Sequence, residues 1–395
     1  MSPTPLSISW WSMPRSPALF DVVIVGGGPV GLYLAALLLQ QGLSVRILEQ
    51  RLERNTHSRA IGIHPPALAA LDRAVAASTL VAEGIAIRRG LAISGGRQLA
   101  EMSFASVSDR FPFVLSVPQA RTEAVLEQRV RDLDADALMR GSQVTDMHDD
   151  GGRVTFDVTP GGVHRQISGT LAVAADGARS TLLGLLGVST TAKTYQDHYL
   201  MGDFADSSGY GHDAALFLEP DGIVESFPLP GGVRRWVARL GQPPGPPDAA
   251  RLAGLVRGRT GIEVEQGTNT MLSSFGVRSN VARRMVVGRT AVIGDAAHEI
   301  SPIGGQGMNL GWLDAAELAP LIVDALKGIP VRQRLRGFEQ KRRRAAGRAV
   351  WQSELNMVLG RPLPWVLQSI RGSAIAGVAS VPSLNRLVAR RFTMQ

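Results

Sequence analysis

The first clear pattern in the chain is an apolar run, a glycine-rich turn and a second, longer apolar run. Residues 21–25 read Asp-Val-Val-Ile-Val, residues 26–31 read Gly-Gly-Gly-Pro-Val-Gly, and residues 32–39 are almost wholly apolar. A shorter run, residues 44–48, ends at Glu49. This order predicts a strand, a tight turn, a helix and a second strand, which together make the βαβ unit of a doubly wound α/β fold.

Strand and helix patterns alternate along the rest of the chain. Alternating runs bounded by turn residues predict strands, and they cover residues 85–94, 98–104, 143–148, 153–158, 163–168, 214–218, 222–227 and 234–240. Two runs, the apolar residues 171–175 and residues 290–293, which are apolar after Thr290, predict buried parallel strands instead. Apolar residues at helical spacing predict helices over residues 65–76, 119–130 and 307–326 and in most of the remainder.

The return of parallel-strand patterns late in the chain predicts two interleaved domains. The expected fold is α/β, with a Rossmann-like dinucleotide-binding domain interleaved with an antiparallel β-sheet substrate domain and followed by a helical C-terminal region. The nucleotide domain would comprise residues 20–76, 119–184 and 281–345, the substrate domain residues 77–118 and 185–280, and the helical region residues 346–395.

Composition narrows the chemistry that this fold can carry. The chain has 395 residues, 45% of them hydrophobic, and no cysteine. Disulfides, thiolate nucleophiles and cysteine-ligated metals are therefore excluded, and redox chemistry must belong to a cofactor. No apolar stretch reaches the roughly eighteen residues of a membrane span, and the first twenty residues lack a secretion signal. We expect a soluble, cytoplasmic monomer or dimer without a metal site, whose first twenty residues precede the fold.

The positive charge of the chain is concentrated in one segment. The formal net charge is +8, and residues 331–350 hold eight basic residues and one acid, Glu339. Such a cluster can attract phosphate, an anionic lipid or an acidic substrate, or can be a solvated helix face. A nucleic-acid surface is disfavoured because the segment, with Phe338 as its single aromatic residue, has no aromatic stacking surface interleaved with the charges.

The glycine turn has the residue types that a dinucleotide needs. Gly26 suits the tight turn, Gly28 lets the backbone approach a pyrophosphate, and Gly31 lets the helix pack close to the strand. The anion would then rest at the positive end of the helix dipole. Glu49, eighteen residues past Gly31, can accept hydrogen bonds from both ribose hydroxyls, which favours FAD or NAD over NADP. A glycine turn without a ligand is the alternative.

Two further motifs follow the expected parallel strands. Asp176-Gly177 follows residues 171–175, and Gly294-Asp295-Ala296-Ala297-His298 follows residues 290–293. The second motif leads into Pro302, the segment Gly304-Gly305-Gln306-Gly307, Met308 and Asn309.

With these three motifs in this order, the chain resembles the class A FAD-dependent aromatic hydroxylases, the family of para-hydroxybenzoate hydroxylase, phenol hydroxylase and the ubiquinone-pathway hydroxylases. The resemblance spans about residues 20–350 and is to short members that lack a thioredoxin-like C-terminal domain. It implies bound FAD, transient NADH or NADPH, and O2 that reacts through a C4a-hydroperoxyflavin to hydroxylate an aromatic or quinone-like small molecule.

The resemblance also implies roles for individual residues. Asp295 would accept from the ribityl hydroxyls of FAD, and Gly304, Gly305 and Gly307 would permit approach to the isoalloxazine. Met308 and Asn309 would open a helix toward its N1 and C2 carbonyl region, and Pro302 would lie beside the flavin face. Arg59 would lie near the FAD pyrophosphate and the path of the nicotinamide, and Gln119 would contact the flavin chain. Asp176 would serve both FAD and the reductant. His298 would act as a proton shuttle or would be a structural loop histidine.

Candidate substrate contacts are apolar residues of the expected antiparallel sheet. They are Phe217, Phe227, Trp236 and Met271, with Tyr199 and His64 as candidate partners of a phenol. Alternatively, each of the four apolar residues belongs to the hydrophobic core and does not contact the substrate.

Three other functions use the same scaffold. A flavin-dependent halogenase would carry a Trp-x-Trp-x-Ile-Pro segment, which does not occur here, and Trp10-Trp11 precedes the expected fold. A flavin-linked reductase or dehydrogenase would oxidise or reduce its substrate without adding oxygen. A binding protein of the GDP dissociation inhibitor type would hold no flavin and would be colourless.

Overall fold

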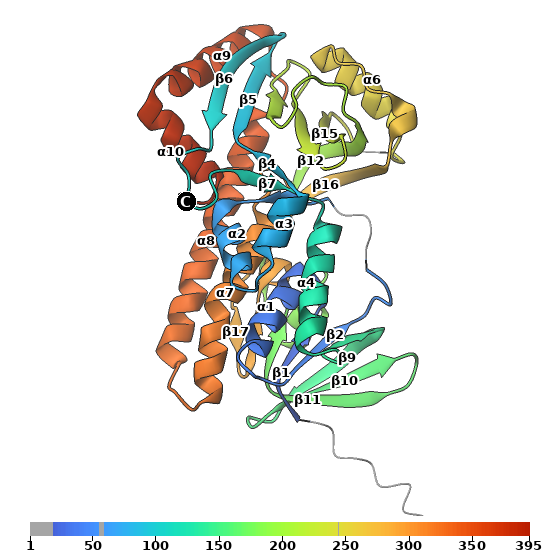
Figure 1. Cartoon of the computed structure of the whole chain (residues 1–395), viewed down its shortest axis with the longest axis vertical. Helices are drawn as coiled ribbons and strands as arrows, with labels where there is room; N and C mark the ends of the chain where they lie inside the picture. The colour runs from blue at the N-terminus through green and yellow to red at the C-terminus, as the bar shows by residue number, and fades with distance from the viewer. Residues whose placement is uncertain (1–18, 55–58, 244) are drawn as a thin grey trace, which may run out of the picture.

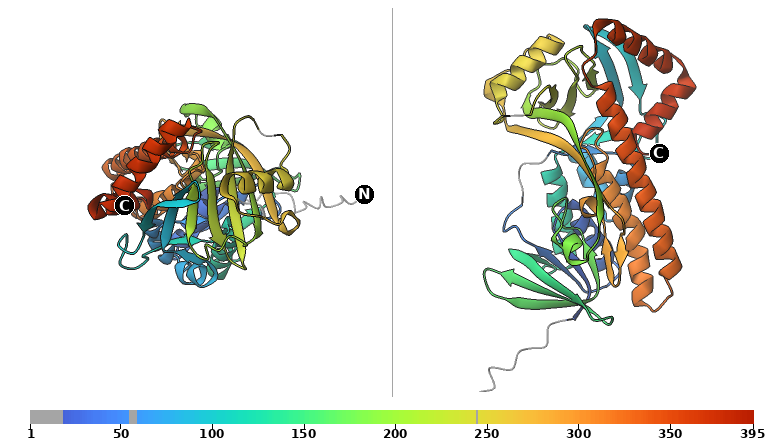
Figure 2. Two further views of the ribbon diagram at one scale, coloured as in Figure 1. Left: turned by 90° about the horizontal axis from the view of Figure 1, so that it is seen from above. Right: turned by 180° about the vertical axis from the view of Figure 1, so that it is seen from behind.

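The computed structural model describes residues 19–54, 59–243 and 245–395. Two sheets lie toward opposite ends of an elongated molecule, and the long helix α8 (Arg332–Leu359) runs beside it (Figures 1 and 2). The mixed α/β class predicted from the sequence is confirmed. The expectations for residues 1–18, including Trp10-Trp11, lie outside the described residues.

The first sheet is built around parallel strands in the order β17-β18-β11-β1-β2-β8. Strands β18, β11, β1, β2 and β8 run parallel to one another in this order, and β17 is antiparallel to β18. Their bounds are β1 (Leu19–Val25), β2 (Val45–Glu49), β8 (Leu138–Arg140), β11 (Arg165–Ala174), β17 (Val286–Val287) and β18 (Thr290–Val292). Because parallel strands end at one edge of the sheet, the segments after β1, β2, β11 and β18 lie close together.

Strand β11 corrects the expectation of two separate strands at residues 163–168 and 171–175. It is one strand, whose first half pairs antiparallel with β10 (Val154–Pro160) and whose second half pairs parallel with β1. Gly169, where the pattern suggested a break, is tightly packed, and a Cβ there would lie 2.9 Å from Val23 Cγ2. The glycine therefore serves a close approach of two strands instead of a turn.

The second sheet has the order β19-β16-β12-β15-β14-β13-β5-β6. Its neighbours are antiparallel except for β13 and β5, which are parallel and depart from the fully antiparallel sheet that was expected. Residues 85–94 also form two strands in place of one, because β4 belongs to a small sheet with β3 and β7. The bounds are β5 (Arg89–Ser94), β6 (Arg97–Ser103), β12 (Thr190–Ala205), β13 (Ala214–Phe217), β14 (Val224–Leu229), β15 (Val233–Leu240), β16 (Met271–Ala282) and β19 (His298–Glu299).

The two faces of the second sheet have different neighbours. Helix α6 (Ala249–Thr260) covers one face, where its Leu252 and Val256 pack in one buried cluster with sheet residues. The other face packs against Ile303, in the loop before α7 (Gly307–Leu326), and against Met357 of α8. We call this second side the inner face, because it contacts the segment that follows the Gly294-Asp295 motif.

The remaining helices and strands pack around the two large sheets, extend the first sheet or form the small third sheet. They are α1 (Pro29–Leu39), α2 (Pro65–Asp72), α3 (Ala77–Glu83), α4 (Gln119–Leu133), α5 (Thr181–Leu185), α9 (Trp365–Ser380), α10 (Pro382–Phe392), β3 (Gly62–Ile63), β4 (Ile85–Ile87), β7 (Val114–Ser116) and β9 (Ser142–Asp149). Helices α1, α4 and α7 contribute to the core of the first domain. Among the described helices, none combines the length and the apolar character needed to cross a membrane.

Candidate active site

The glycine turn after β1 is held by two close contacts and leaves one open position. Gly26 has φ +110°, and a Cβ on it would lie 2.2 Å from the Ala175 carbonyl oxygen. A Cβ on Gly31 would lie 2.0 Å from the Gly26 oxygen, whereas a Cβ on Gly28 would meet no atom within 4 Å. Gly26 and Gly31 are therefore required by packing, and Gly28 faces open space at the positive end of α1.

Glu49 ends β2 directly beside this turn. Its Oε2 accepts from Gly27 N–H at 2.8 Å, and its Oε1 accepts from the backbone and side chain of Arg51 at 2.8 and 3.0 Å. Burial alone would raise the pKa of Glu49, but the hydrogen bonds from Arg51 and Gly27 outweigh it and hold the pKa below its ordinary value. The carboxylate is thus ionised at neutral pH, as an acceptor of ribose hydroxyls must be.

Asp176 follows β11 and borders the same turn. A Cβ on Gly26 would lie 2.8 Å from the Asp176 nitrogen. Asp176 Oδ2 accepts from Leu182 N–H at 3.1 Å, whereas Oδ1 is buried and has no hydrogen-bond partner in the described part of the chain. Burial raises the pKa of this carboxyl. A buried acceptor without a partner is uncommon and is typical of a group that awaits a ligand.

Asp295 follows β18 and lies between the starts of α1 and α7. Gly294 has φ +64° and packs on Val30 of α1, while a Cβ on Gly307 would lie 3.8 Å from Asp295 Oδ1. The side chain is exposed to solvent on its open side. The protein around it restricts its hydration and raises the pKa to about 6, with His298 opposing the shift and Glu299 adding to it.

The loop before α7 is fixed by one asparagine. Gly304 and Gly305 have φ +96° and +65°. Asn309 Nδ2 donates to the Gly305 oxygen at 2.6 Å and to the Gly62 oxygen at 3.0 Å, and its Oδ1 accepts from His64 N–H at 2.8 Å. The side chain of Asn309 is thus fully used in holding the glycine loop against β3.

Backbone amides remain available at the start of α7. Leu310 N–H donates to the Gln306 oxygen, so the amides of Gly307, Met308 and Asn309 precede the first intrahelical hydrogen bond. These three amides lie at the positive end of a 20-residue helix. Pro302, at the start of the glycine loop, is exposed, and its oxygen accepts from Gly305 N–H at 3.0 Å.

Arg59 joins the first domain to the inner face of the second sheet, and Gln119 holds the residue next to it. Arg59 Nε donates to Ser273 Oγ at 3.2 Å, and its guanidinium lies 5.1 Å from the centre of the Phe275 ring. The Arg59 oxygen accepts from Arg235 Nη1 at 2.6 Å. Gln119 begins α4, and its N–H donates to the oxygen of Ala60, the residue next to Arg59.

His298 lies behind the Asp295 loop in a buried ionic network. Its Nε2 is 2.6 Å from Asp314 Oδ2, which also accepts from Gly294 N–H at 3.0 Å, and Asp314 Oδ1 accepts from Arg342 Nε at 2.5 Å. Burial lowers the pKa of His298, but Asp314 raises it by more. Through the shared Asp314 Oδ2, His298 is linked to the backbone of the Gly294-Asp295 turn.

Alternation along the strands divides the four candidate substrate residues between the two faces of the second sheet. Phe217 and Trp236 belong to the buried cluster that packs on α6, so they face away from the Asp295 loop. Phe227 is paired across the strands with Arg235, and Met271 packs in the inner-face cluster. Only Phe227 and Met271 are therefore retained as candidate substrate contacts.

Tyr199 and His64 carry buried polar atoms without partners. Tyr199 stacks on Phe275 on the inner face, with ring centres 5.6 Å apart, and its hydroxyl is buried and unpartnered in the described residues. Burial lowers the pKa of His64 to about 4. The nearby Gly304 backbone opposes this shift, although neither ring nitrogen of His64 forms a hydrogen bond with a described residue. His64 is therefore neutral at physiological pH.

One functional candidate, Glu225, was missed by the sequence analysis. It pairs with Val237, which pairs with Met201, so all three side chains lie on the inner face. Burial raises the pKa of Glu225 to about 7, and no hydrogen bond to its carboxyl occurs among the described residues. Its position, two residues before Phe227 in an alternating strand, is the pattern from which it could have been found.

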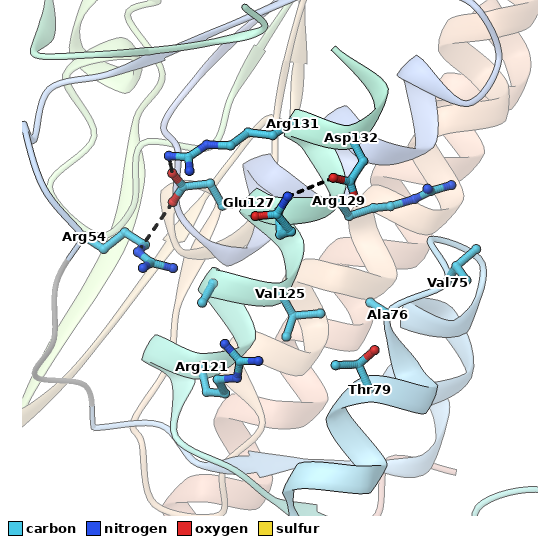
Figure 3. Close-up of a pocket in the computed structure, with 12 residues that line it drawn as sticks. Arg54, Val75, Ala76, Thr79, Arg121, Val125, Glu127, Arg129, Arg131 and Asp132 are labelled. Carbon is cyan, nitrogen blue, oxygen red and sulfur yellow. Dashed lines mark hydrogen bonds and ion pairs between the residues drawn. The ribbon is translucent and has the colours of Figure 1, made fainter. Parts of the chain in front are cut away.

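A well-formed surface cavity lies away from these residues. It has a volume of about 550 Å³ and lies between α3 and α4, where Arg121, Glu127, Arg129 and Asp132 line it (Figure 3). A second cavity of about 500 Å³ surrounds Asp197. Neither lining includes a residue of the three motifs, so the candidate site is defined by converging loops and polar groups instead of by volume.

The parallel sheet and the loops at its carboxyl edge define a dinucleotide-binding flavoprotein fold. The chain matches the family described as FAD binding domain over residues 20–353. It is 31% identical over 397 residues to the anhydrotetracycline monooxygenase of Streptomyces rimosus, which covers 94% of this chain and 75% of the relative. It is 33% identical over 321 residues to the 6-methylpretetramide 4-monooxygenase of the same species, which covers 78% of this chain but only 56% of the relative.

The solved structures agree with this assignment. The p-nitrophenol 4-monooxygenase of Pseudomonas putida DLL-E4 has the same fold, with a TM-score of 0.87 at 24% identity, and 95% of this chain and 98% of that chain are covered. The chain therefore belongs to the FAD binding domain family. The resemblance to class A FAD-dependent hydroxylases is confirmed, and FAD is the cofactor.

A matched pair of glycine substitutions tests the turn after β1. We expect Gly31→Ala to lower the free energy of unfolding by about 1–3 kcal/mol, because its Cβ would overlap the Gly26 oxygen. Gly28→Ala should leave the stability nearly unchanged and weaken FAD binding about tenfold by placing a methyl where the pyrophosphate approaches. Urea unfolding and fluorescence titration with FAD measure the two effects. Unchanged FAD affinity in Gly28→Ala would show that the open position is not the phosphate site.

Proposed function

We propose that the chain is an FAD-dependent monooxygenase that uses NADH or NADPH and O2 to hydroxylate an aromatic or quinone-like small molecule. The observation that carries this proposal is the convergence of the glycine turn, Asp176 and Asp295 at one edge of the parallel sheet, next to the inner face of the second sheet. The names of the relatives support it, because the similar proteins from Streptomyces rimosus are monooxygenases.

The chain's own residues would divide the work of holding the cofactor. Glu49 would accept from the adenosine ribose, Gly28 would admit the pyrophosphate, and Asp295 would accept from the ribityl chain. The amides of Gly307 and Met308 would donate to the pyrimidine edge of the ring system. When bound, FAD supplies the hydride acceptance and the O2 activation, which amino-acid side chains do not provide.

The inner face supports an aromatic substrate with a polar substituent. Met201 and Met271 belong to the inner-face cluster, while Phe227, on the same side of β14 as Glu225, packs at its edge against the cluster that contains Phe104 and Val114. Glu225 and Tyr199 place two buried polar groups on the same face. A site of this composition binds an apolar ring and fixes its orientation through a few polar contacts. A phenol or carbonyl oxygen directed at Glu225 and Tyr199 would satisfy both groups.

The proposed reaction is tested with the FAD-loaded protein, NADH or NADPH, and labelled O2. The first probes are p-nitrophenol and anhydrotetracycline, taken from the names of similar proteins. Substrate-dependent reductant oxidation, with one labelled oxygen atom in the product, is the expected result. Reductant oxidation coupled to substrate conversion without oxygen incorporation would instead assign a reductase, and a protein that remains colourless after incubation with FAD would rule out both.

Glu225 predicts a dependence of stability on pH that does not require a substrate. The folded protein holds a proton on Glu225 that the unfolded chain releases between pH 4.5 and about 7, so stability falls as the pH rises through this window. We expect Glu225→Gln to match the wild type near pH 4.5 and to be more stable by about 3 kcal/mol near pH 8. Urea unfolding at both pH values measures this.

The control is Glu265→Gln, which removes a charge from an exposed glutamate. Its stability relative to the wild type should change little between the two pH values. If Glu225→Gln shows no greater pH dependence than Glu265→Gln, then Glu225 is hydrated in solution and is not a buried acid of the substrate site.

A further inference from the structure

The two last helices present apolar side chains to solvent. Helices α9 and α10 lie at the outer edge of the molecule, beside β6, in both views (Figures 1 and 2). Seven of their aliphatic side chains are between 40% and 61% exposed. These residues, which we call the C-terminal apolar stripe, are Val366, Leu367, Ile370 and Val378 of α9 and Leu384, Leu387 and Val388 of α10.

Several polar side chains of the same helices face inward. Gln368 Nε2 donates to Ser94 Oγ at 3.0 Å, and Arg371, only 9% exposed, donates to the Leu218 oxygen at 3.2 Å. Asn385 Nδ2 donates to a backbone oxygen of β6 at 2.8 Å. A helix on the surface of a globular protein normally buries its apolar side and exposes its polar side. Here several polar residues dock the helices while apolar residues point outward, so an apolar surface of the kind that marks interaction sites is left exposed.

The positive charge around the C-terminal apolar stripe favours an anionic partner. Residues 355–395 contain five arginines and no aspartate, glutamate or lysine. Arg386, Arg390 and Arg391 of α10 are exposed and form no ion pair with any described residue. Apolar side chains flanked by arginines on one helix are complementary to the interface of an anionic lipid bilayer. Pairing of two copies through the stripe would instead bring like charges together.

The basic segment of α8 is a different surface. In residues 331–350, Arg342 is buried on Asp314, while Arg334 and Lys341 pair with acids of α7. The exposed residues of this segment are polar or glycine, so it has nothing to insert among lipid chains. Helices α9 and α10, which carry the stripe, follow the opposite, C-terminal end of α8 (Figure 2).

We propose that α9 and α10 form a peripheral membrane-binding site for anionic lipid. The C-terminal apolar stripe enters the interface between headgroups and acyl chains, and the three exposed arginines of α10 contact the lipid phosphates. The helices lie in the plane of the interface, because neither has the length or the apolar character to span it.

The test is flotation of the full, FAD-loaded chain with lipid vesicles. One set of vesicles is phosphatidylcholine, and the other is an equal mixture of phosphatidylcholine and phosphatidylglycerol. The protein should float with the mixed vesicles and less with phosphatidylcholine alone. The triple variant Leu384→Ser, Leu387→Ser, Val388→Ser should reduce the bound fraction at least about tenfold, because it removes most of the apolar surface of α10 that inserts.

A matched control replaces exposed aliphatic residues elsewhere. Val75→Ser, Val163→Ser and Ile329→Ser change three side chains of 63%, 58% and 46% exposure that lie outside α9 and α10, and this variant should bind like the wild type. Retention of FAD and of the circular dichroism spectrum confirms that both variants are folded. Wild-type protein that fails to float with the mixed vesicles overturns the proposal. So does a dimer in light scattering that the α10 variant converts to monomer while flotation is unchanged, which would assign the stripe to a contact between copies.

Discussion

Replacing Asp295 by alanine is expected to yield a folded protein that is nearly colourless after purification. The ionised carboxylate would accept hydrogen bonds from the ribityl hydroxyls of FAD, and loss of charged hydrogen bonds costs about 3 kcal/mol, or roughly a hundredfold in affinity. Because the pKa of Asp295 is raised, its removal should not destabilise the protein without FAD. Visible absorption of the purified protein and FAD titration measure the effect.

Glu299→Ala is the matched control for this loop. Glu299 lies four residues further on and pairs with Arg278 at 2.6 Å, so its loss should leave FAD binding within about threefold of the wild type. A pH series adds an independent check. Wild-type affinity for FAD should fall as the pH drops through about 6, and Asp295→Asn should lose this dependence. Full retention of FAD by Asp295→Ala would remove Asp295 from the cofactor site.

The parts of the site that could be predicted are those that local sequence determines. Gly26 and Gly31 were expected to serve the turn and the close packing of α1, and each has backbone atoms where a Cβ would stand. Helix α7 begins at Gly307 and ends at Leu326, as the apolar spacing predicted. Helix α7 and the contact of Gly31 with Gly26 depend on residues close together in the chain, and the Gly26 turn is recognisable from its local glycine pattern although its close contact is with the distant Ala175.

The side of the sheet on which a residue lies could not be predicted in the same way. Alternation places Phe227 and Glu225 on one side of β14 and Val224 on the other, but which side meets the FAD loop depends on where α6 and α8 pack. Phe217 and Trp236 were thus expected at the substrate and lie on α6. The same limit applies to Gly169, whose role appears only when β1 is laid beside β11.

His298 shows how a motif residue can act through the scaffold. Its position directly after Gly294-Asp295 suggested a proton shuttle, but its Nε2 is engaged by Asp314, which also receives the Gly294 amide. The network therefore connects the turn that presents Asp295 to α7 and, through Arg342, to α8. Precise placement of a binding group by neighbours that never touch the ligand is a common requirement of such sites.

Asp314→Ala is accordingly expected to be the most destabilising single substitution proposed, at about 3–5 kcal/mol, because it leaves Arg342 and His298 buried without their counter-charge. Asp324→Ala is the matched control, since Asp324 also joins α7 to α8, through Arg334, but on the surface, where such a pair contributes about 1 kcal/mol or less. Urea unfolding of both variants without FAD measures the difference. Asp314→Leu combined with Arg342→Met should recover part of the loss, since no charge of this pair is then stranded. Equal stability of Asp314→Ala and Asp324→Ala would mean that the Gly294-Asp295 turn holds its shape without the buried network.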